Sequence, residues 1–144
     1  MVSTDVSAGF SIRPLSVSDY PSMCALWDAD GYRVRSIQDG ERVIRSFLAR
    51  NGAYCFGAVS GGELVGFIMV GCDGRSARVY HLVIRSEHRR LGVAHALTEA
   101  AWDVLKTEGV CGVVVFREDP SVTFWESEGF RDRDDLSLKA SDDF

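Results

Sequence analysis

The chain has 144 residues, a formal net charge of −5, 46% hydrophobic residues and 26% charged residues. This size and composition are typical of one globular domain with a core of its own. No apolar run approaches the roughly 18 residues of a membrane span, and the negative charge argues against a nucleic-acid-binding protein. The four cysteines form no Cys-x-x-Cys pair, which argues against a zinc or redox site.

Helix-capping residues and glycine turns divide the chain into short elements. Residues 1–9 are small and polar and lack the regions of a signal peptide, so we expect a flexible segment in a cytoplasmic protein. Capping boxes at Ser16–Asp19 and Ser36–Asp39 each precede a helical apolar stripe, and Gly61-Gly62 marks a hairpin turn. In chain order the pattern predicts strand 10–15, helices after residues 19 and 39, strands 53–59, 64–71 and 78–84, a helix from residue 93, strand 111–117, helix 120–128 and strand 136–138.

The order of these elements predicts a mixed sheet in a single domain over residues 10–140. Strands joined by hairpins are antiparallel, whereas the helical crossover after residue 84 makes strand 78–84 parallel to strand 111–117. Two such parallel strands can splay apart and leave a cleft.

A basic turn lies between that strand and the helix that follows it. The run His88-Arg89-Arg90-Leu91-Gly92-Val93-Ala94 opens the helix directly after the strand. The first N–H groups of a helix have no internal partners, and the helix dipole adds partial positive charge there. Gly92 lets the backbone approach a ligand closely. This pattern predicts a phosphate or pyrophosphate site.

Together with Phe124-Trp125-Glu126-Ser127-Glu128-Gly129-Phe130, the turn from Arg89 to Ala94 resembles the GCN5-related N-acetyltransferases, the GNAT family. The likeness covers nearly the whole chain, and the stretches Gly71–Arg75 and Asp135–Leu138 are similar to small bacterial YpeA-like members. It implies the α/β (α+β) GNAT fold. That fold has a mixed, mostly antiparallel sheet of six to seven strands, with helices on both faces and a central, splayed parallel pair.

The resemblance also implies acetyl-CoA as co-substrate and assigns residues to it. The backbone of Leu82, Val83 and Ile84 would pair with the pantetheine arm, and one N–H would bind the thioester oxygen. The pyrophosphate would lie against the turn, and Trp125 would contact the pantetheine or its sulfur. The residues of the turn are Arg89, Arg90, Leu91, Gly92, Val93 and Ala94.

Two of the departures from the family pattern concern the cofactor site, while Glu118 stands where many members have asparagine and Ser86 replaces a common proline. Arg90 stands where the family usually has glycine, so it must adopt whatever backbone shape the loop needs. Trp125 stands where many members have a tyrosine that protonates the leaving thiolate, and an indole N–H has no acidity near neutral pH.

An amine acceptor is mostly protonated at neutral pH, so a base must take a proton from it. The candidates are His81 and Tyr80 before the cofactor strand segment, then Glu118 with Asp119 at the end of the next strand. Histidine has the right intrinsic pKa, although a lone histidine in a strand is often only a satisfied polar group. The three histidines fall on a strand, a loop and a helix, so we expect no metal site.

These observations predict an N-acetyltransferase that transfers an acetyl group from acetyl-CoA to a primary amine of a small molecule or a protein by direct attack. The alternative is a CoA-binding module with weak or no catalysis, acting as a sensor or interaction domain. The acidic balance favours cationic acceptors, and exposed strand edges would permit a homodimer. One stretch between the first and third strands has two interpretations: it contacts the acceptor, or it is an ordinary helix surface. Its residues are Trp27, Asp28, Asp30, Tyr32, Arg33 and Arg35.

Overall fold

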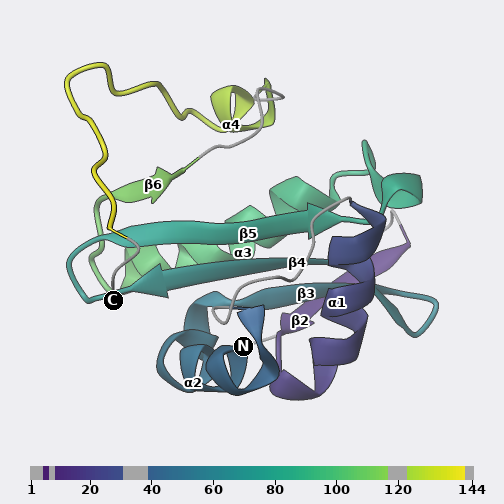
Figure 1. Ribbon diagram of the computed structural model, residues 1–144. Coiled ribbons are helices and arrows are strands. Elements are labelled where there is room, and N and C mark those ends of the chain that lie inside the picture. Colours follow the sequence, from purple (N-terminus) through teal and green to yellow (C-terminus); the bar gives the residue numbers. More distant parts are fainter. Residues whose placement is uncertain (1–4, 7–8, 31–38, 117–122, 142–144) are drawn as a thin grey trace.

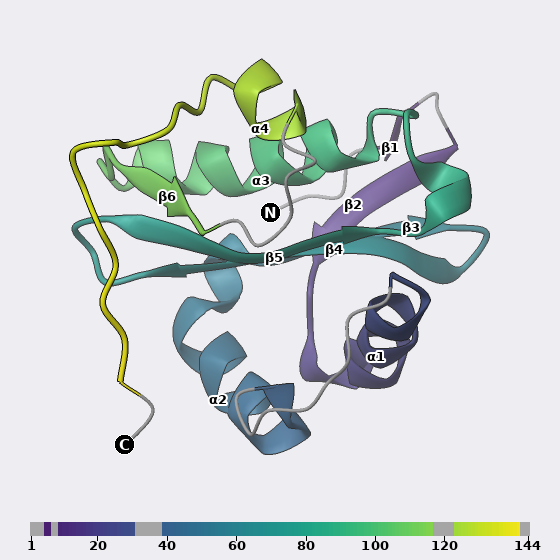
Figure 2. The same ribbon diagram turned by 45° about the horizontal axis from the view of Figure 1, so that its top comes forward.

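A twisted sheet between two helical layers makes up the body of the molecule (Figure 1). The computed structural model describes residues 5–6, 9–30, 39–116 and 123–141. Figure 2 shows α3 (Val93–Thr107) and the short α4 (Thr123–Ser127) on one side of the sheet. On the other side lie α1 (Tyr20–Ala29) and α2 (Glu41–Asn51). None of the helices in the described ranges is long and apolar enough to cross a membrane.

The sheet runs in chain order, β1-β2-β3-β4-β5-β6, and every neighbouring pair is antiparallel except β5 and β6. The parallel pairing of β5 with β6 confirms the crossover expected after residue 84. The strands are β1 (Asp5–Val6), β2 (Phe10–Pro14), β3 (Phe56–Ser60), β4 (Glu63–Cys72), β5 (Ala77–Ile84) and β6 (Val113–Val115).

The local signals for helix starts and turns are confirmed. Ser16 and Asp19 form the expected capping box in the 3-10 turn that leads into α1. Gly61 and Gly62 have φ values of 58° and 80°, the left-handed backbone that a two-residue hairpin needs. The second expected capping box, Ser36–Asp39, lies mostly outside the described residues.

Each face of the sheet buries its own apolar cluster. On one face, α3 packs Val93, Leu97 and Leu105 against the sheet. On the other, Trp27 and Ile44 from α1 and α2 pack against the sheet. Helical side chains at i, i+4 spacing bury one stripe, which fixes α3 beside β5 and its amino terminus beside the carboxyl end of that strand.

The prediction of a strand at residues 136–138 is wrong. The segment is irregular, and Leu136 and Leu138 are 61% and 71% exposed. Local contacts form here instead, a bidentate ion pair from Arg133 to Asp135 and a turn bond from the Leu136 N–H to the Arg133 carbonyl, and residues 136–138 pair with no strand of the described sheet. The five other expected strands form, and the two-residue β1, rather than 136–138, is the sixth strand. The parallel pair consequently lies at one side of the described sheet and not at its centre.

Candidate functional site

The free edge of β5 is the first feature of the site. β6 pairs with β5 only at Ala77, Arg78 and Val79, and ends at Val115. Within the described ranges, the remainder of β5 has no strand partner on this side. The backbone from Leu82 to Ile84, to which the family resemblance assigned the pantetheine arm, therefore lies along an edge that an extended ligand can join.

A β-bulge brings the two strand candidates for the base onto one face of the sheet. Met69 of β4 pairs with His81 and Val70 pairs with Val79, so Tyr80 is the extra residue. The Tyr80 ring packs edge-on against Phe47 of α2 at 5.3 Å between centroids. The His81 ring packs against Trp27 of α1 at 5.0 Å. Regular alternation would have put Tyr80 and His81 on opposite faces.

Asp39 is a site residue that the sequence analysis did not single out for chemistry. Its Oδ1 lies 3.6 Å from Nε2 of His81, and the two side chains are 7% and 19% exposed. The Tyr20 hydroxyl donates a hydrogen bond of 2.6 Å to the Asp39 carbonyl and anchors this part of the chain. Burial, followed by Cys24 and Asp39, raises the pKa of Tyr20 to about 12, which keeps this phenol protonated as the donor.

The turn before α3 has left-handed backbone at two positions. Arg90 has a φ of 65°, the one positive value among non-glycine residues of the described chain, and Gly92 has a φ of 84°. Val93, which is 1% exposed, anchors the first turn of α3 in the core. The loop thus needs left-handed backbone at residue 90, which explains why glycine would be the ordinary choice there.

The two arginines of this turn lie in different environments. Arg89 forms an ion pair with Asp30 at the end of α1, and its Nε donates to the Ile84 carbonyl at 3.3 Å. Arg90 is exposed, and no ion pair connects it to another described residue. Arg89 therefore fastens the loop to α1 and β5, while Arg90 is the cation available to a ligand. His88, expected to be exposed, is half-buried, and its Nδ1 is buried with no partner.

Trp125 belongs to an aromatic cluster at the wall of the site. Its ring contacts Phe124 and Phe130 edge-on, each at 5.0 Å between centroids. The carboxylate of Glu128 holds α4 against α3, because it accepts a hydrogen bond of 3.1 Å from Thr98 and lies 3.0 Å from Nδ1 of His95. That contact with Glu128 raises the pKa of His95. The remaining catalytic candidate, Glu118, lies outside the described residues.

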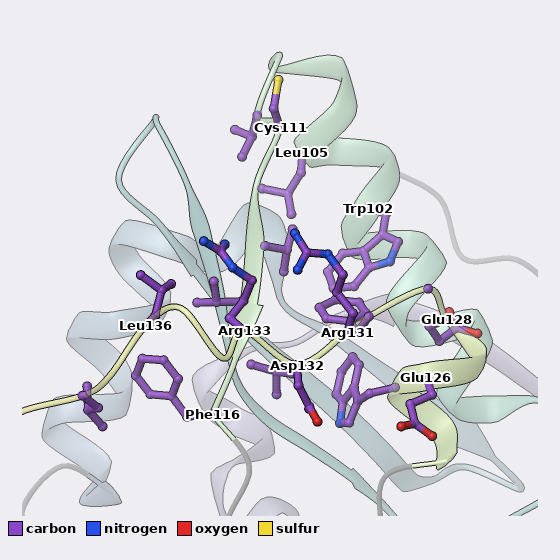
Figure 3. Close-up of a pocket in the computed structure, with 18 of the residues that line it drawn as sticks. Trp102, Leu105, Cys111, Phe116, Glu126, Glu128, Arg131, Asp132, Arg133 and Leu136 are labelled. Carbon is purple, nitrogen blue, oxygen red and sulfur yellow. The ribbon is translucent and has the colours of Figure 1, made fainter.

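A cavity of about 890 Å³ connects these features. It extends from Arg90 and Gly92 at the start of α3, along β5, to His81 and Asp39. Trp125 lines it and also lines a second hollow, of about 850 Å³, between β6, α3, α4 and the chain around Arg133 (Figure 3). In the described portion of the chain, no group of three or more His, Cys, Asp and Glu side chains could hold a metal ion.

Comparisons with known proteins agree with this geometry. A family model described as an acetyltransferase (GNAT) domain matches residues 33–140. The fold is similar to an aminoglycoside acetyltransferase, meta-AAC0020, from an uncultured soil metagenomic sample, with a TM-score of 0.74 at 20% identity over 95% of this chain and 99% of that chain. It is also similar to a ribosomal-protein-alanine N-acetyltransferase from Brucella melitensis biovar Abortus 2308, with a TM-score of 0.69 at 20% identity over 92% and 98% of the two chains.

A third similar structure was solved in complex with coenzyme A. It is the PaiA N-acetyltransferase from Thermoplasma acidophilum, with a TM-score of 0.67 at 18% identity over 83% of this chain and 87% of that chain. At these identities the solved structures establish a shared mixed α/β fold and do not identify the acceptor.

Proposed function

The chain belongs to the GNAT family of acetyl-CoA-dependent N-acetyltransferases, and we propose that it acetylates a primary amine in the cavity along β5, with His81 as the base. The observation that carries this proposal is the pairing of His81 with the buried Asp39, just beyond the point where β5 and β6 part. A half-buried imidazole beside a buried carboxylate can take the proton that an ammonium must lose.

The shape of the cavity supports the fit of acetyl-CoA. We assign the pyrophosphate to the backbone N–H groups from Leu91 to Ala94, since the start of a helix favours an anion. Arg90 adds an unpaired cation there, whereas Arg89 acts by holding the loop in place. The free edge from Leu82 to Ile84 accepts the pantetheine arm as an added strand, and Trp125 packs against it.

Acetyl-CoA supplies the acetyl group as a thioester, which the neutral amine attacks directly, forming the C–N bond as the C–S bond breaks. His81 takes the proton that the ammonium must lose. Asp39 is a positioning residue, because its carboxylate orients the imidazole and stabilises the imidazolium. A backbone N–H of β5 donates to the oxygen on which negative charge develops.

The leaving thiolate needs no strong acid. Trp125 is a donor only and cannot protonate it. A thiol has an ordinary pKa of about 8.5, so the thiolate is already a fair leaving group near neutral pH.

Steady-state kinetics with acetyl-CoA and a panel of amines test this assignment. His81→Gln should lower kcat by about a hundredfold and leave the KM for acetyl-CoA unchanged. Asp39→Asn should lower kcat by about tenfold and displace the pH profile of kcat, because it removes the group that orients the base. Tyr80→Phe is the matched control, since it keeps the ring on Phe47 and removes only the hydroxyl.

Two results would overturn the assignment. An equal loss of kcat in Tyr80→Phe and His81→Gln, or a pH profile that His81→Gln leaves unchanged, would exclude His81 as the base. A folded protein that binds acetyl-CoA but acetylates no amine would be a binding module instead.

A further inference from the structure

Arg78 is a cation in the acceptor part of the cavity for which the reaction described above has no use. It lies on β5 two residues before Tyr80 and lines the same cavity as His81. Its guanidinium carbon lies 4.3 Å from the centroid of the Tyr80 ring and 4.1 Å from that of the Phe116 ring. The guanidinium is therefore stacked between two aromatic side chains, one from β5 and one from the residue after β6.

The stacked guanidinium of Arg78 has no protein partner for its charge: no carboxylate among the described residues forms an ion pair with it. Its Nε is buried without a hydrogen-bond partner, so the two terminal nitrogens are the groups that remain for a ligand. Buried polar atoms in proteins are nearly always satisfied. A guanidinium stacked on rings still presents its N–H groups in its own plane, in the fork that matches a carboxylate or a phosphate.

We propose that Arg78 binds an anionic group, a carboxylate or a phosphate, carried by the amine acceptor. The inference rests on the proposed function, because it names the substrate class for the same cavity. Asp39 and Arg78 then form opposite ends of the acceptor site, with the ammonium near Asp39 and His81 and the anion on Arg78. The net charge of −5 suggested a purely cationic acceptor. The charges of Asp39 and Arg78 within the cavity instead favour an acceptor that carries both an amine and an anionic group.

The spacing along β5 limits the acceptor further. The proposal places the amine at His81, which is three residues after Arg78 on β5 and about 10 Å from it along a regular strand. The bulge at Tyr80 shortens this span. The amine and the anionic group must therefore be several bonds apart, so an ω-amino acid or an aminoalkyl phosphate fits and glycine does not.

Matched pairs of acceptors test the proposal in the full-length protein with acetyl-CoA. δ-Aminovalerate is compared with pentylamine, and aminopentyl phosphate with aminopentanol, so that each pair differs only in the anionic group. We expect kcat/KM for the anionic member to exceed that of its neutral partner by about tenfold or more. The pair with the larger ratio distinguishes carboxylate from phosphate, and cadaverine serves as the dicationic control.

Two variants separate charge from packing. Arg78→Met keeps an unbranched chain between the two rings and should remove the preference by raising KM for the anionic acceptor, with kcat for pentylamine and the affinity for acetyl-CoA unchanged. Arg78→Lys should restore part of the preference, because it restores the charge without the fork.

The outcomes are distinct. Equal or better turnover of pentylamine or cadaverine by the parent protein would overturn the role of Arg78 and leave the acetyltransferase intact, even if the Met variant failed to fold. An equal loss on every acceptor in Arg78→Met would overturn it as well, since only packing would then be affected. Turnover of none of these amines would instead refute the proposed function, and the role of Arg78 with it.

Discussion

The left-handed backbone of Arg90 predicts that glycine at this position stabilises the protein. A non-glycine residue in this conformation costs about 1–2 kcal/mol, and Arg90 has a φ of 65°. Glycine removes that cost but loses about 0.5–1 kcal/mol more conformational entropy on folding. The balance favours Arg90→Gly over Arg90→Ala by about 1 kcal/mol in the free energy of unfolding, because alanine retains the strained backbone.

Urea unfolding of the two variants without ligand measures the backbone contribution, since both have lost the same charge. Calorimetric titration with acetyl-CoA measures the contribution of the charge. Both variants should bind acetyl-CoA up to about tenfold more weakly than the parent, and part of the salt dependence of binding should disappear.

A glycine variant that is no more stable than the alanine variant would exclude a backbone cost at residue 90. Acetyl-CoA affinities equal to that of the parent would show that the charge of Arg90 does not contribute to binding the ligand.

Two further predictions concern pH. Burial would raise the pKa of Asp19, but its hydrogen bonds from Arg13 and from the Ser16 N–H lower it overall. Asp19→Asn should therefore cost about 2 kcal/mol of unfolding free energy above pH ~4, with the difference from the parent shrinking as the pH falls through the pKa of the folded state. Urea unfolding at several pH values measures this, and a difference independent of pH would contradict it. The raised pKa of His95 gives stability that is complete below pH ~6.5 and lost as the pH rises through the pKa of the folded state. This contribution to the free energy of unfolding is less than about 1 kcal/mol because the His95 ring is mostly exposed. An NMR titration should show Glu128→Gln returning the pKa of His95 toward its ordinary value, and an unmoved pKa would exclude the contact.

The sequence predicted the parts of this fold that depend on neighbouring residues. The capping box at Ser16–Asp19, the hairpin at Gly61-Gly62 and the start of α3 after Gly92 are local patterns, and all three form. The strand expected at residues 136–138 does not form, because two alternating leucines do not decide pairing when the Leu136 N–H bonds within the local turn at Arg133.

The site was less accessible from sequence because its contacts join distant segments. His81 was named as a candidate, but Asp39, whose carboxylate lies 3.6 Å from it, comes from the segment before α2 and looked like a helix cap. The fastening of Arg89 to Asp30 likewise depends on how α1 meets the loop. A β-bulge leaves no mark in the period-2 pattern of the strand, so the common face of Tyr80 and His81 emerged only from the register of β4 and β5.

The bulge at Tyr80 interrupts the regular pairing of β4 with β5 and places the Tyr80 ring beside Arg78. A chain without this one residue could form an unbroken ladder between β4 and β5, with every backbone group paired in sequence. It would also lose the ring that Arg78 stacks on and that Phe47 supports. Deletion of Tyr80 would therefore exchange the stacking partner of Arg78 for a regular pairing of β4 with β5. The extra residue interrupts the ladder at the one place where its ring contacts both Arg78 and Phe47.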